Sequence, residues 1–357
     1  MKFLKNILHA QTQYILNHPK LKRLAPLFLA TEDFFFGTAH TTKIAPHIVD
    51  NIDIKRYMSF VIIGLLPATL AGIYFYGLRM LSIIIVSYTF GGIVEVIFAI
   101  VRRKPIYEGF LVTGLIFPLV LPPTIPLWMV AVGIMFGIFF GKEVFGGTGR
   151  NIFNVALTAR VFLSMAFPEQ FASMWAEPYA SGLGGFVKYG VDSITSATPL
   201  ILFKGSHVLD VSSYMSMFLG NIAGSIGETS KIAIIVGGLF LCITRIADWR
   251  IPLSYIVSVA ICSYFLNYFS PQFAPPIFQL LAGGVLFGAF FMMTDPVTAP
   301  LTFEGKWIAG FIAGVLTVLI RGISGFAEGV MFAILLTNAV CPLIDSLIMN
   351  YKFKERK

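Results

Sequence analysis

The sequence predicts an all-α integral membrane protein of about ten transmembrane helices, in two inverted five-helix repeats that contain broken helices. Three observations lead to this prediction. The chain is 57% hydrophobic and only 12% charged, which is about half the charged fraction of a soluble domain. Many stretches approach the roughly 20 apolar residues needed to cross a bilayer. Short spans interrupted by glycine or proline also recur at matching places in the two halves of the chain.

The apolar segments form two sets of five on either side of a long polar loop. The first set covers residues 58–76, 80–101, 110–121, 127–140 and 152–167, and the second covers 232–244, 251–269, 277–293, 307–320 and 329–349. Because each set has an odd number of spans, we expect the second to lie upside down relative to the first. The predicted divisions are an N-terminal cytoplasmic extension, the first repeat, an extracytoplasmic loop, the second repeat and a basic cytoplasmic tail, at residues 1–51, 52–167, 168–230, 231–349 and 350–357.

Matching proline-rich turns follow one span in each set. Residues 122–126 read Pro-Pro-Thr-Ile-Pro, and residues 294–300 read Thr-Asp-Pro-Val-Thr-Ala-Pro. Unwound backbone at membrane depth is tolerated only where protein or a cavity covers it. Interrupted spans at matching places therefore indicate a central site. Helices that simply end at prolines would give the same pattern, and this alternative stays open.

Lysine and arginine are unevenly distributed between the loops. With the N-terminus inside, most of them lie in cytoplasmic segments, and the opposite side holds Arg79, Lys188, Lys204, Lys231 and Arg321. This bias places residue 198 on the outer side of the membrane. The net charge of +8 is therefore a loop bias and gives no reason to expect a nucleic-acid partner. Residues 1–51 lack the pattern of a signal peptide, and we expect a surface-lying extension with a helix near residues 2–18.

Neither cysteine nor histidine spacing suggests a metal centre. The cysteines lie far apart within apolar segments, at Cys242, Cys262 and Cys341. No CxxC or paired Cys/His spacing occurs, so we expect no metal site and no disulfide. The five histidines lie outside the spans, and no nucleophile–base arrangement is evident. We therefore expect no catalytic residue of a self-contained hydrolytic site.

The polar loop contains a small, hydroxyl-rich motif. Residues 192–200 read Asp-Ser-Ile-Thr-Ser-Ala-Thr-Pro-Leu. Pro199 favours an extended backbone at Thr198, so the hydroxyl of this threonine is expected to be presented rather than helical. Its small neighbours Ser196 and Ala197 leave room for a bulky group. Most Ser/Thr-rich loops have no further role, so the spacing alone leaves both interpretations open.

This motif resembles the flavin-attachment site of the Rnf D and Nqr B subunits, which are membrane subunits of ion-translocating ferredoxin:NAD⁺ and NADH:quinone oxidoreductases. Asp192, Thr195, Ala197 and Thr198 match the pattern Asp-x-x-Ser/Thr-x-Ala-Thr, and the resemblance extends over about residues 45–345. In that family FMN is bound through its phosphate to the threonine. The resemblance implies a covalent FMN phosphoester on Thr198. Asp192 and Thr195 would belong to the sequence read by a flavin-attaching enzyme, and Ser196 and Ala197 would be further cofactor-binding residues.

Gly146 and Gly147 open a cytoplasmic glycine turn that leads to Asn151 and Asn154. It is not a nucleotide-binding loop, because no Gly-Lys-Ser/Thr follows and no strand precedes it. Glycines allow close approach of a planar ligand or a helix, and amides both donate and accept, which suits a flavin ring edge. The asparagines match the pair that holds a non-covalent riboflavin in Nqr B, although Val155 replaces the usual proline. Structural capping by these asparagines is the alternative.

Three carboxylates are candidates for an ion path. Glu95 lies within a span after Gly91 and Gly92, and a carboxylate at the bilayer centre costs about 2.5–3.5 kcal/mol. The resemblance associates this Gly-Gly-x-x-Glu pattern with ion passage and the quinone region. A hydrogen bond to a neighbouring helix and a position nearer the interface are the alternatives. Asp295 and Asp345 also match acids of the family's ion route, although either could simply mark a turn or a helix end.

The resemblance implies a subunit that relays electrons between flavins, coupled to Na⁺ or H⁺ movement, in a bacterial or archaeal cytoplasmic membrane. Pro199 and Leu200 favour Rnf D, the N-terminal extension favours Nqr B, and we weigh the motif more heavily. The implied partners are other subunits with flavin and iron–sulfur groups, the flavin-attaching enzyme and lipid. A flavin-free transporter or channel and a structural scaffold are the alternatives, because fold alone does not fix function.

Overall fold

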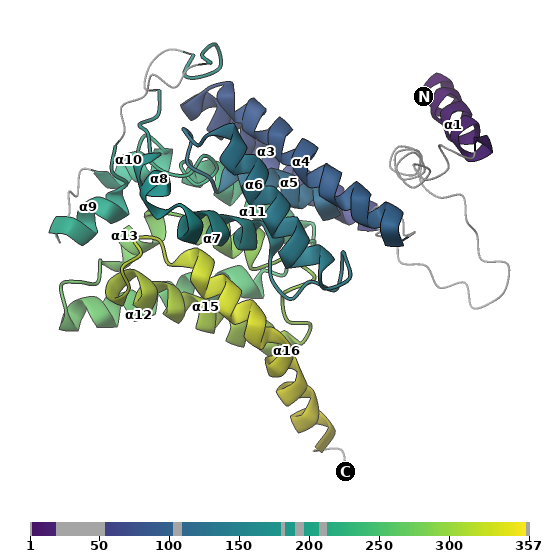
Figure 1. The fold of residues 1–357 in the computed structure, drawn as a ribbon. Coiled ribbons are helices and arrows are strands. Elements are labelled where there is room, and N and C mark those ends of the chain that lie inside the picture. Colours follow the sequence, from purple (N-terminus) through teal and green to yellow (C-terminus); the bar gives the residue numbers. More distant parts are fainter. Residues whose placement is uncertain are drawn as a thin grey trace.

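The computed structural model describes residues 2–18, 54–102, 109–179, 183–189, 196–206 and 213–354. Helices joined by turns and loops make up this part of the chain, and no strand is present within it (Figure 1). The N-terminal helix α1 (Lys2–Asn17) confirms the helix expected near residues 2–18. Most of the rest of the predicted N-terminal extension lies outside the described residues.

The first set of spans corresponds to α3 (Ile54–Tyr76), α4 (Arg79–Arg102), α5 (Gly109–Leu119), α6 (Leu127–Ile138) with the π-helical turn η2 (Phe139–Glu143), and α7 (Val155–Ala166). The polar loop carries three short helices, α8 (Pro168–Ser173), α9 (Pro199–Ser206) and α10 (Ser213–Leu219). The second set corresponds to α11 (Lys231–Ile243), α12 (Arg250–Phe269), α13 (Pro276–Leu281), α14 (Val285–Phe287), the π-helical turn η3 (Gly288–Met292), α15 (Phe303–Ile323) and α16 (Val330–Lys354).

Helix lengths divide these elements into full spans and partial ones. The helices long and apolar enough to cross a membrane are α3, α4, α12, α15 and α16, and α5, α7 and α11 are shorter apolar helices. The 11 residues of α5 extend about 16 Å, roughly half the thickness of the hydrocarbon core. Each predicted span falls on one of these helices or helix pieces. The prediction of an all-α, multi-pass membrane protein with broken helices is therefore confirmed.

The second set is broken at a place that the proline pattern did not indicate. The predicted span 277–293 is interrupted inside, between α13 and α14, where Gly283 has a φ of +63°. A left-handed backbone favours glycine, since other residues pay a steric cost there. This break lies within an apolar run, so the prolines at residues 296 and 300 follow a span that is already divided.

Helix pairing recurs between the two sets. In the first set α4 packs against α5 and α6, and α6 packs against α7; in the second, α12 packs against α13 and α15, and α15 packs against α16. The sets meet where α3 lies along α11 and α7 along α16. The α3–α11 contact is close because Gly64 faces Gly237, where a Cβ would collide with the Gly64 backbone. The recurrence agrees with two related sets, and the predicted domain boundaries stay a prediction.

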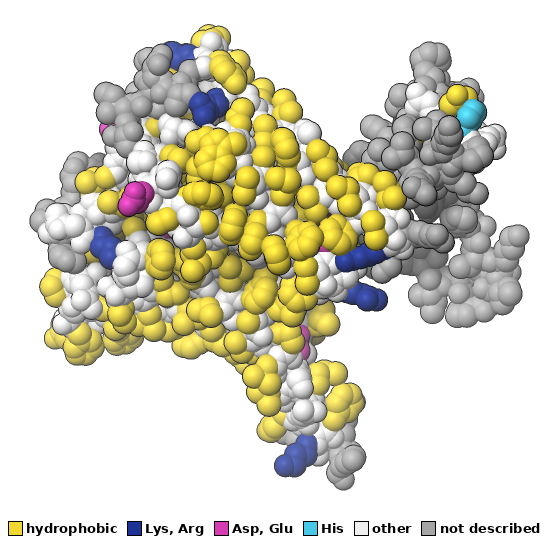
Figure 2. Space-filling view, viewed as in Figure 1, with side chains coloured by type: hydrophobic (Ala, Val, Ile, Leu, Met, Phe, Trp, Pro, Cys, Tyr) yellow, Lys and Arg dark blue, Asp and Glu magenta, His cyan; other side chains and the backbone are white. Residues whose placement is uncertain are grey.

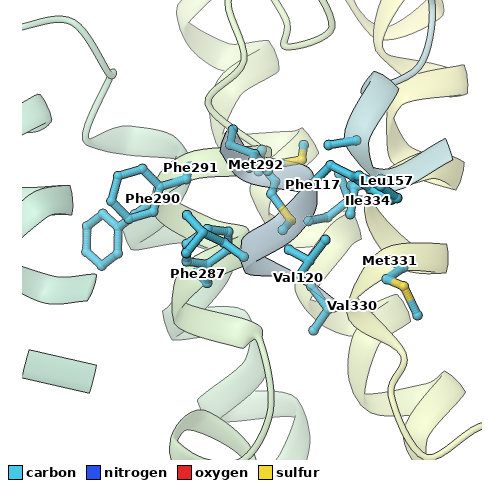
Figure 3. Packing of buried hydrophobic residues seen from close by; sticks show 14 of the residues in the cluster. Phe117, Val120, Leu157, Phe287, Phe290, Phe291, Met292, Val330, Met331 and Ile334 are labelled. Atoms are coloured by element: carbon cyan, nitrogen blue, oxygen red, sulfur yellow. The ribbon is translucent and has the colours of Figure 1, made fainter. Parts of the chain in front are cut away.

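The broken segments meet in an apolar centre. Figure 3 shows side chains of the first set, including Phe117 and Val120, near Phe287 and Met292 of the second. Outside, hydrophobic side chains cover much of the face seen in Figure 2. Such a large apolar surface is expected where lipid surrounds a protein. The fold thus holds unwound backbone inside the protein, as a membrane requires.

Candidate functional site

Thr198 lies immediately before α9 and is half-buried. Its Oγ1 accepts a hydrogen bond of 3.4 Å from the Ile201 backbone N–H, which is the geometry of a helix N-cap. The threonine is thus at a helix start rather than within a helix, as the following proline suggested. Ser196 donates its backbone N–H to the Trp175 carbonyl at 3.0 Å, which ties the motif to the segment after α8. Of the remaining predicted motif residues, Ala197 is half-buried, and Asp192 and Thr195 lie outside the described residues.

A cavity of about 570 Å³ opens beside Thr198; we call it the outer cavity. Its volume falls in the range of about 300–1,000 Å³ that is usual for ligand pockets. Apolar and aromatic side chains form much of its wall, and charged groups come from several elements: Arg160, Lys204, Glu228, Lys231 and Glu328. Lys204 of α9 donates to the Phe326 carbonyl at 2.8 Å, and partial burial lowers the pKa of this lysine. An aromatic wall with nearby cations suits a flavin and its phosphate, so the residues present fit FMN.

A buried ion pair joins α7 of the first set to the polar loop at this cavity. Arg160 of α7 is 2% exposed, and its Nη1 lies 3.0 Å from Oε1 of Glu228, which is 4% exposed. The second guanidinium nitrogen donates to Ser225 Oγ at 3.3 Å. Sequence reasoning missed this pair. The available signal was an arginine in the middle of the predicted span 152–167, because charges at that depth need a partner.

A second buried pair holds the break between α13 and α14. Nη2 of Arg321 lies 2.8 Å from Oε1 of Glu328, and the other Glu328 oxygen accepts from the Gly284 backbone N–H at 3.2 Å. At the other end of the same peptide group, Lys231 donates to the Gly283 carbonyl at 2.8 Å. The sequence placed Lys231 and Arg321 in outer loops. Both side chains are instead buried, and they bond to the unwound backbone between α13 and α14. These bonds satisfy polar groups that lipid cannot satisfy.

Asn151 and Asn154 line a second, smaller cavity, which we call the inner cavity; it measures about 70 Å³. Asn154 caps α7, because its Oδ1 accepts from the backbone N–H groups of Ala156 and Leu157 at 3.1 and 3.3 Å. Its Nδ2 donates to the Met292 carbonyl of η3 at 3.3 Å. Asn151 donates locally to Phe153 at 3.1 Å. The capping alternative is thus realised at Asn154, and riboflavin binding by Asn151 and Asn154 stays a prediction.

The four glycines predicted to belong to sites differ in what their backbone requires. Gly146 and Gly147 have φ values of +115° and +97°, which favour glycine. Gly91 is buried, and a Cβ there would press on Phe110 and Ile138, so it allows close helix packing. Gly92 has ordinary room for a Cβ. None of these four glycines lines the inner or outer cavity.

Glu95 has a partner that the sequence did not reveal. The carboxylate is buried on α4 and forms an ion pair with Nζ of Lys142, which lies in η2 and is also buried. Lys142 also lines the inner cavity. The alternative of a bond to a neighbouring segment is therefore realised, and Glu95 lies one side chain away from the cavity that holds Asn154.

The two remaining carboxylates organise turns. Asp295 lines the inner cavity and accepts from the Val297 backbone N–H at 3.3 Å and from Thr298 Oγ1 at 3.2 Å. Asp345 of α16 accepts from the backbone N–H groups of Leu301 and Thr302 at 2.8 and 3.1 Å. The inner cavity thus brings Asn151, Asn154 and Asp295 together. Asp345 and Thr198 lie outside it, and α7 separates it from the outer cavity.

Comparisons with known proteins give the family. The NQR2, RnfD, RnfE family model matches residues 41–354. The chain belongs to this family. It is 37% identical to the B subunit of the Na(+)-translocating NADH-quinone reductase of Ectopseudomonas mendocina (strain ymp), over 94% of each chain. It is 38% identical to the corresponding protein of Azotobacter vinelandii, over 92% of this chain and 93% of the relative.

A third relative, the corresponding protein of Pseudomonas paraeruginosa, is 35% identical over 99% of this chain and 98% of its own length. The family resemblance seen in the sequence is therefore confirmed. All three relatives are of the Nqr B kind, so the preference for Rnf D gains no support from them. The alignment with this third relative covers nearly the whole chain and therefore includes the N-terminal extension. That extension was the feature that favoured Nqr B.

Proposed function

We propose that the chain is the B-type membrane subunit of a Na⁺-translocating NADH:quinone reductase, and that it carries FMN as a phosphoester on Thr198. The outer cavity carries this proposal, because one space of ligand size is lined by Thr198, an aromatic wall and several cations. The activity for which the relatives are named supports the reductase assignment. The other subunits of the complex, the flavin-attaching enzyme and the lipid of a bacterial cytoplasmic membrane are the proposed partners.

FMN, when bound, supplies a ring that accepts and gives up electrons. The residues of the chain bind and orient it. Thr198 supplies the ester oxygen at a fixed helix start. Lys204 and Lys231 contribute positive charge near the phosphate end, and Phe171 and Trp175 contribute aromatic and apolar wall. A covalent bond prevents loss of the flavin in either redox state.

Na⁺ translocation is the proposed coupling, with Glu95, Asp295 and Asp345 as ion-path candidates. Glu95, through Lys142, and Asp295 both adjoin the inner cavity. The hydrogen bonds of Asp345 to the turn before α15 make its contribution indirect. Gly91 and Gly92 stay candidates for a quinone region. A riboflavin held by Asn151 and Asn154 is a further proposal, and no step is assigned to it.

An Rnf D-type subunit is the second candidate, because Pro199 and Leu200 follow the motif threonine. Pro199 is also the first residue of α9, a position where proline is favoured in any helix. The proline therefore has a local structural reason that is independent of the type of complex. This makes the motif a weak basis for choosing between the two subunits.

The test is in-gel flavin fluorescence after denaturing electrophoresis, with the flavin-attaching enzyme co-expressed. We expect a fluorescent band for the native chain and for Thr198→Ser, which keeps a hydroxyl. Thr198→Asn should give no band, although asparagine is as good a helix N-cap as threonine. This variant separates loss of the ester from loss of folding.

The proposal fails if the native chain carries no covalent flavin, or if Thr198→Asn is as fluorescent as the native chain. Electron transfer from NADH to quinone in the assembled complex then distinguishes the two subunit types. Na⁺-stimulated quinone reduction is expected for an Nqr B-type subunit. Electron exchange with ferredoxin instead would favour the Rnf D type.

A further inference from the structure

A third cavity of about 590 Å³ lies where α12 and α15 begin. Three cations and one carboxylate line it: Arg245, Arg250, Lys306 and Asp248. We call it the basic cleft. It belongs to the side of the membrane that the charge distribution assigns to the cytoplasm. None of the residues of the predicted flavin or ion sites lines it.

Positive charge is in excess in the basic cleft. Nζ of Lys306 lies 2.8 Å and Nη1 of Arg250 lies 3.5 Å from the same Oδ2 of Asp248. Burial raises the pKa of Asp248, but hydrogen bonds from Lys306 and Arg250 outweigh this effect and hold the pKa below its ordinary value. The single carboxylate is therefore ionised and shared by two cations. The Arg245 side chain is exposed and has no hydrogen-bond or ion-pair partner within the described part of the chain.

The backbone at Arg245 is unusual for an arginine. Its φ is +58°, the one positive φ of a non-glycine residue among the described residues. The Ile246 N–H bonds to the Leu241 carbonyl at 3.0 Å, and the Arg245 N–H bonds to the Cys242 carbonyl at 3.2 Å. These two bonds form a Schellman motif, in which glycine is the usual residue at this position. Stability alone would favour glycine, so the arginine side chain calls for another reason.

Exposed aromatic side chains surround the cleft. Trp249 is 51% and Trp307 is 41% exposed, and their rings meet edge to face with centroids 5.8 Å apart. The guanidinium of Arg250 lies 4.3 Å from the ring centroid of Phe303, which is also exposed. Tryptophans at such a level are typical of the membrane–water interface. The cleft therefore adjoins the headgroup region.

An apolar surface leads from the cleft along the spans. On α12, exposed apolar side chains recur every four residues at Leu253, Val257 and Ile261. On the adjoining α15 they include Ile308 and Phe311. Residues four apart share one face of a helix. This face continues from the aromatic rim toward the bilayer interior, where acyl chains would lie.

We propose that the basic cleft binds the phosphate of an anionic phospholipid, whose acyl chains lie along this face of α12 and α15. Basic pockets beside transmembrane helices on the cytoplasmic side suit such headgroups. Arg245, in the turn after α11, and Lys306, in the first turns of α15, approach the phosphate, and Arg250 is held between Asp248 and Phe303. A lipid matches the whole surface, whereas free phosphate matches the cleft alone. The site is independent of the proposed flavin.

The test uses the full chain in nanodiscs that contain phospholipids with brominated acyl chains, which quench nearby tryptophans. A Trp128→Phe, Trp175→Phe background leaves Trp249 and Trp307 as reporters. We expect brominated phosphatidylglycerol to quench them at lower mole fraction than brominated phosphatidylcholine. Removal of one cation should weaken this preference about fivefold.

Arg245→Gly is the decisive variant. It should weaken the preference for phosphatidylglycerol about fivefold, while the chain unfolds at a higher temperature, because glycine relieves the left-handed backbone. Loss of binding with gained stability cannot come from misfolding. The matched control is Lys354→Gln, which removes one cytoplasmic charge outside the cleft and should leave the preference unchanged.

Three results would overturn the proposal. Equal quenching by the two lipids would show that the cleft does not select an anion. An equal effect of Arg245→Gly and Lys354→Gln would show a general charge effect. Displacement of phosphatidylglycerol by millimolar inorganic phosphate would assign the cleft to a free anion. Retained quenching in phosphate supports the lipid.

Discussion

The outer and inner cavities lie at opposite ends of α7, and they are built from different interactions. The outer cavity, of about 570 Å³, is bordered by the Arg160–Glu228 pair and by Glu328, the partner of Arg321. The inner cavity, of about 70 Å³, is closed by the cap of Asn154 and its bond to Met292. Asn154 and Arg160 are six residues apart, which is about 9 Å along a helix.

The difference lies in what the polar groups are used for. Around the outer cavity, charged side chains satisfy one another and the unwound backbone, so the aromatic wall and the Thr198 region remain available to a ligand. Around the inner cavity, the side-chain amide of Asn154 is already hydrogen-bonded to the first turn of α7 and to the Met292 carbonyl of η3. A flavin fits the first arrangement. The second would need these bonds to be exchanged before a ring could enter.

The largest expected effect comes from breaking the outer ion pair. Arg160→Met leaves Glu228 buried without its partner, which should cost about 3–5 kcal/mol of unfolding free energy. Thermal unfolding in detergent, followed by tryptophan fluorescence, measures this. The double variant Arg160→Met, Glu228→Met removes both charges and should recover most of the loss.

Arg150→Met is the matched control, because Arg150 is exposed and its replacement should change stability by less than about 0.5 kcal/mol. If Arg160→Met lowers the free energy of unfolding by no more than this control does, the ion pair does not stabilise the outer cavity. If the double variant is as unstable as the single one, pairing is not the role of Arg160.

A smaller effect is expected at the inner cavity. Asn154→Ala removes the cap of α7 and should cost about 0.5–2 kcal/mol, measured by the same thermal unfolding. Asn154→Ser keeps a capping oxygen but loses the bond to Met292, so its cost should be intermediate. Asn151→Ala should cost least, because Asn151 makes only a local bond. Equal costs for Asn151→Ala and Asn154→Ala would contradict the capping assignment.

Local pattern was enough for part of this structure. Apolar length predicted the spans, and the proline after Thr198 indicated that this residue is not inside a helix; that α9 starts at Pro199 was not predicted. Asn154 before an apolar run was compatible with both a cap and a ligand, and the cap is realised. In these cases the deciding interactions lie within a few residues of one another.

Contacts between distant segments could not be predicted. Glu95 and Lys142 are separated by 47 residues, and Arg160 and Glu228 by 68. Nothing in a single sequence specifies which charges meet inside the membrane. The break at Gly283 was hidden because an apolar run continues on both sides of it. The partner groups that stabilise the break, Lys231 and Glu328, come from other segments.

The smallest expected effect is at the basic cleft, where Asp248 forms solvent-accessible ion pairs. Its folded-state pKa lies below the ordinary value, which is about 3.9. Its contribution to stability is therefore present above that value and is lost as pH falls through the folded pKa. Ion pairs of this kind contribute about 0.2–1 kcal/mol. Asp248→Asn should lower the unfolding temperature slightly at pH 7 and have less effect near pH 3.

Asparagine retains the Oδ1 acceptor for the Arg250 backbone N–H, so this variant isolates the carboxylate charge from that backbone hydrogen bond. A difference from the native chain that is equally large at pH 7 and pH 3 would mean that the charge is not responsible. A loss at pH 7 as large as that of Arg160→Met would mean that the ion pairs of Asp248 are shielded from solvent, like the Arg160–Glu228 pair. The contrast between a buried and a solvent-accessible ion pair would then fail.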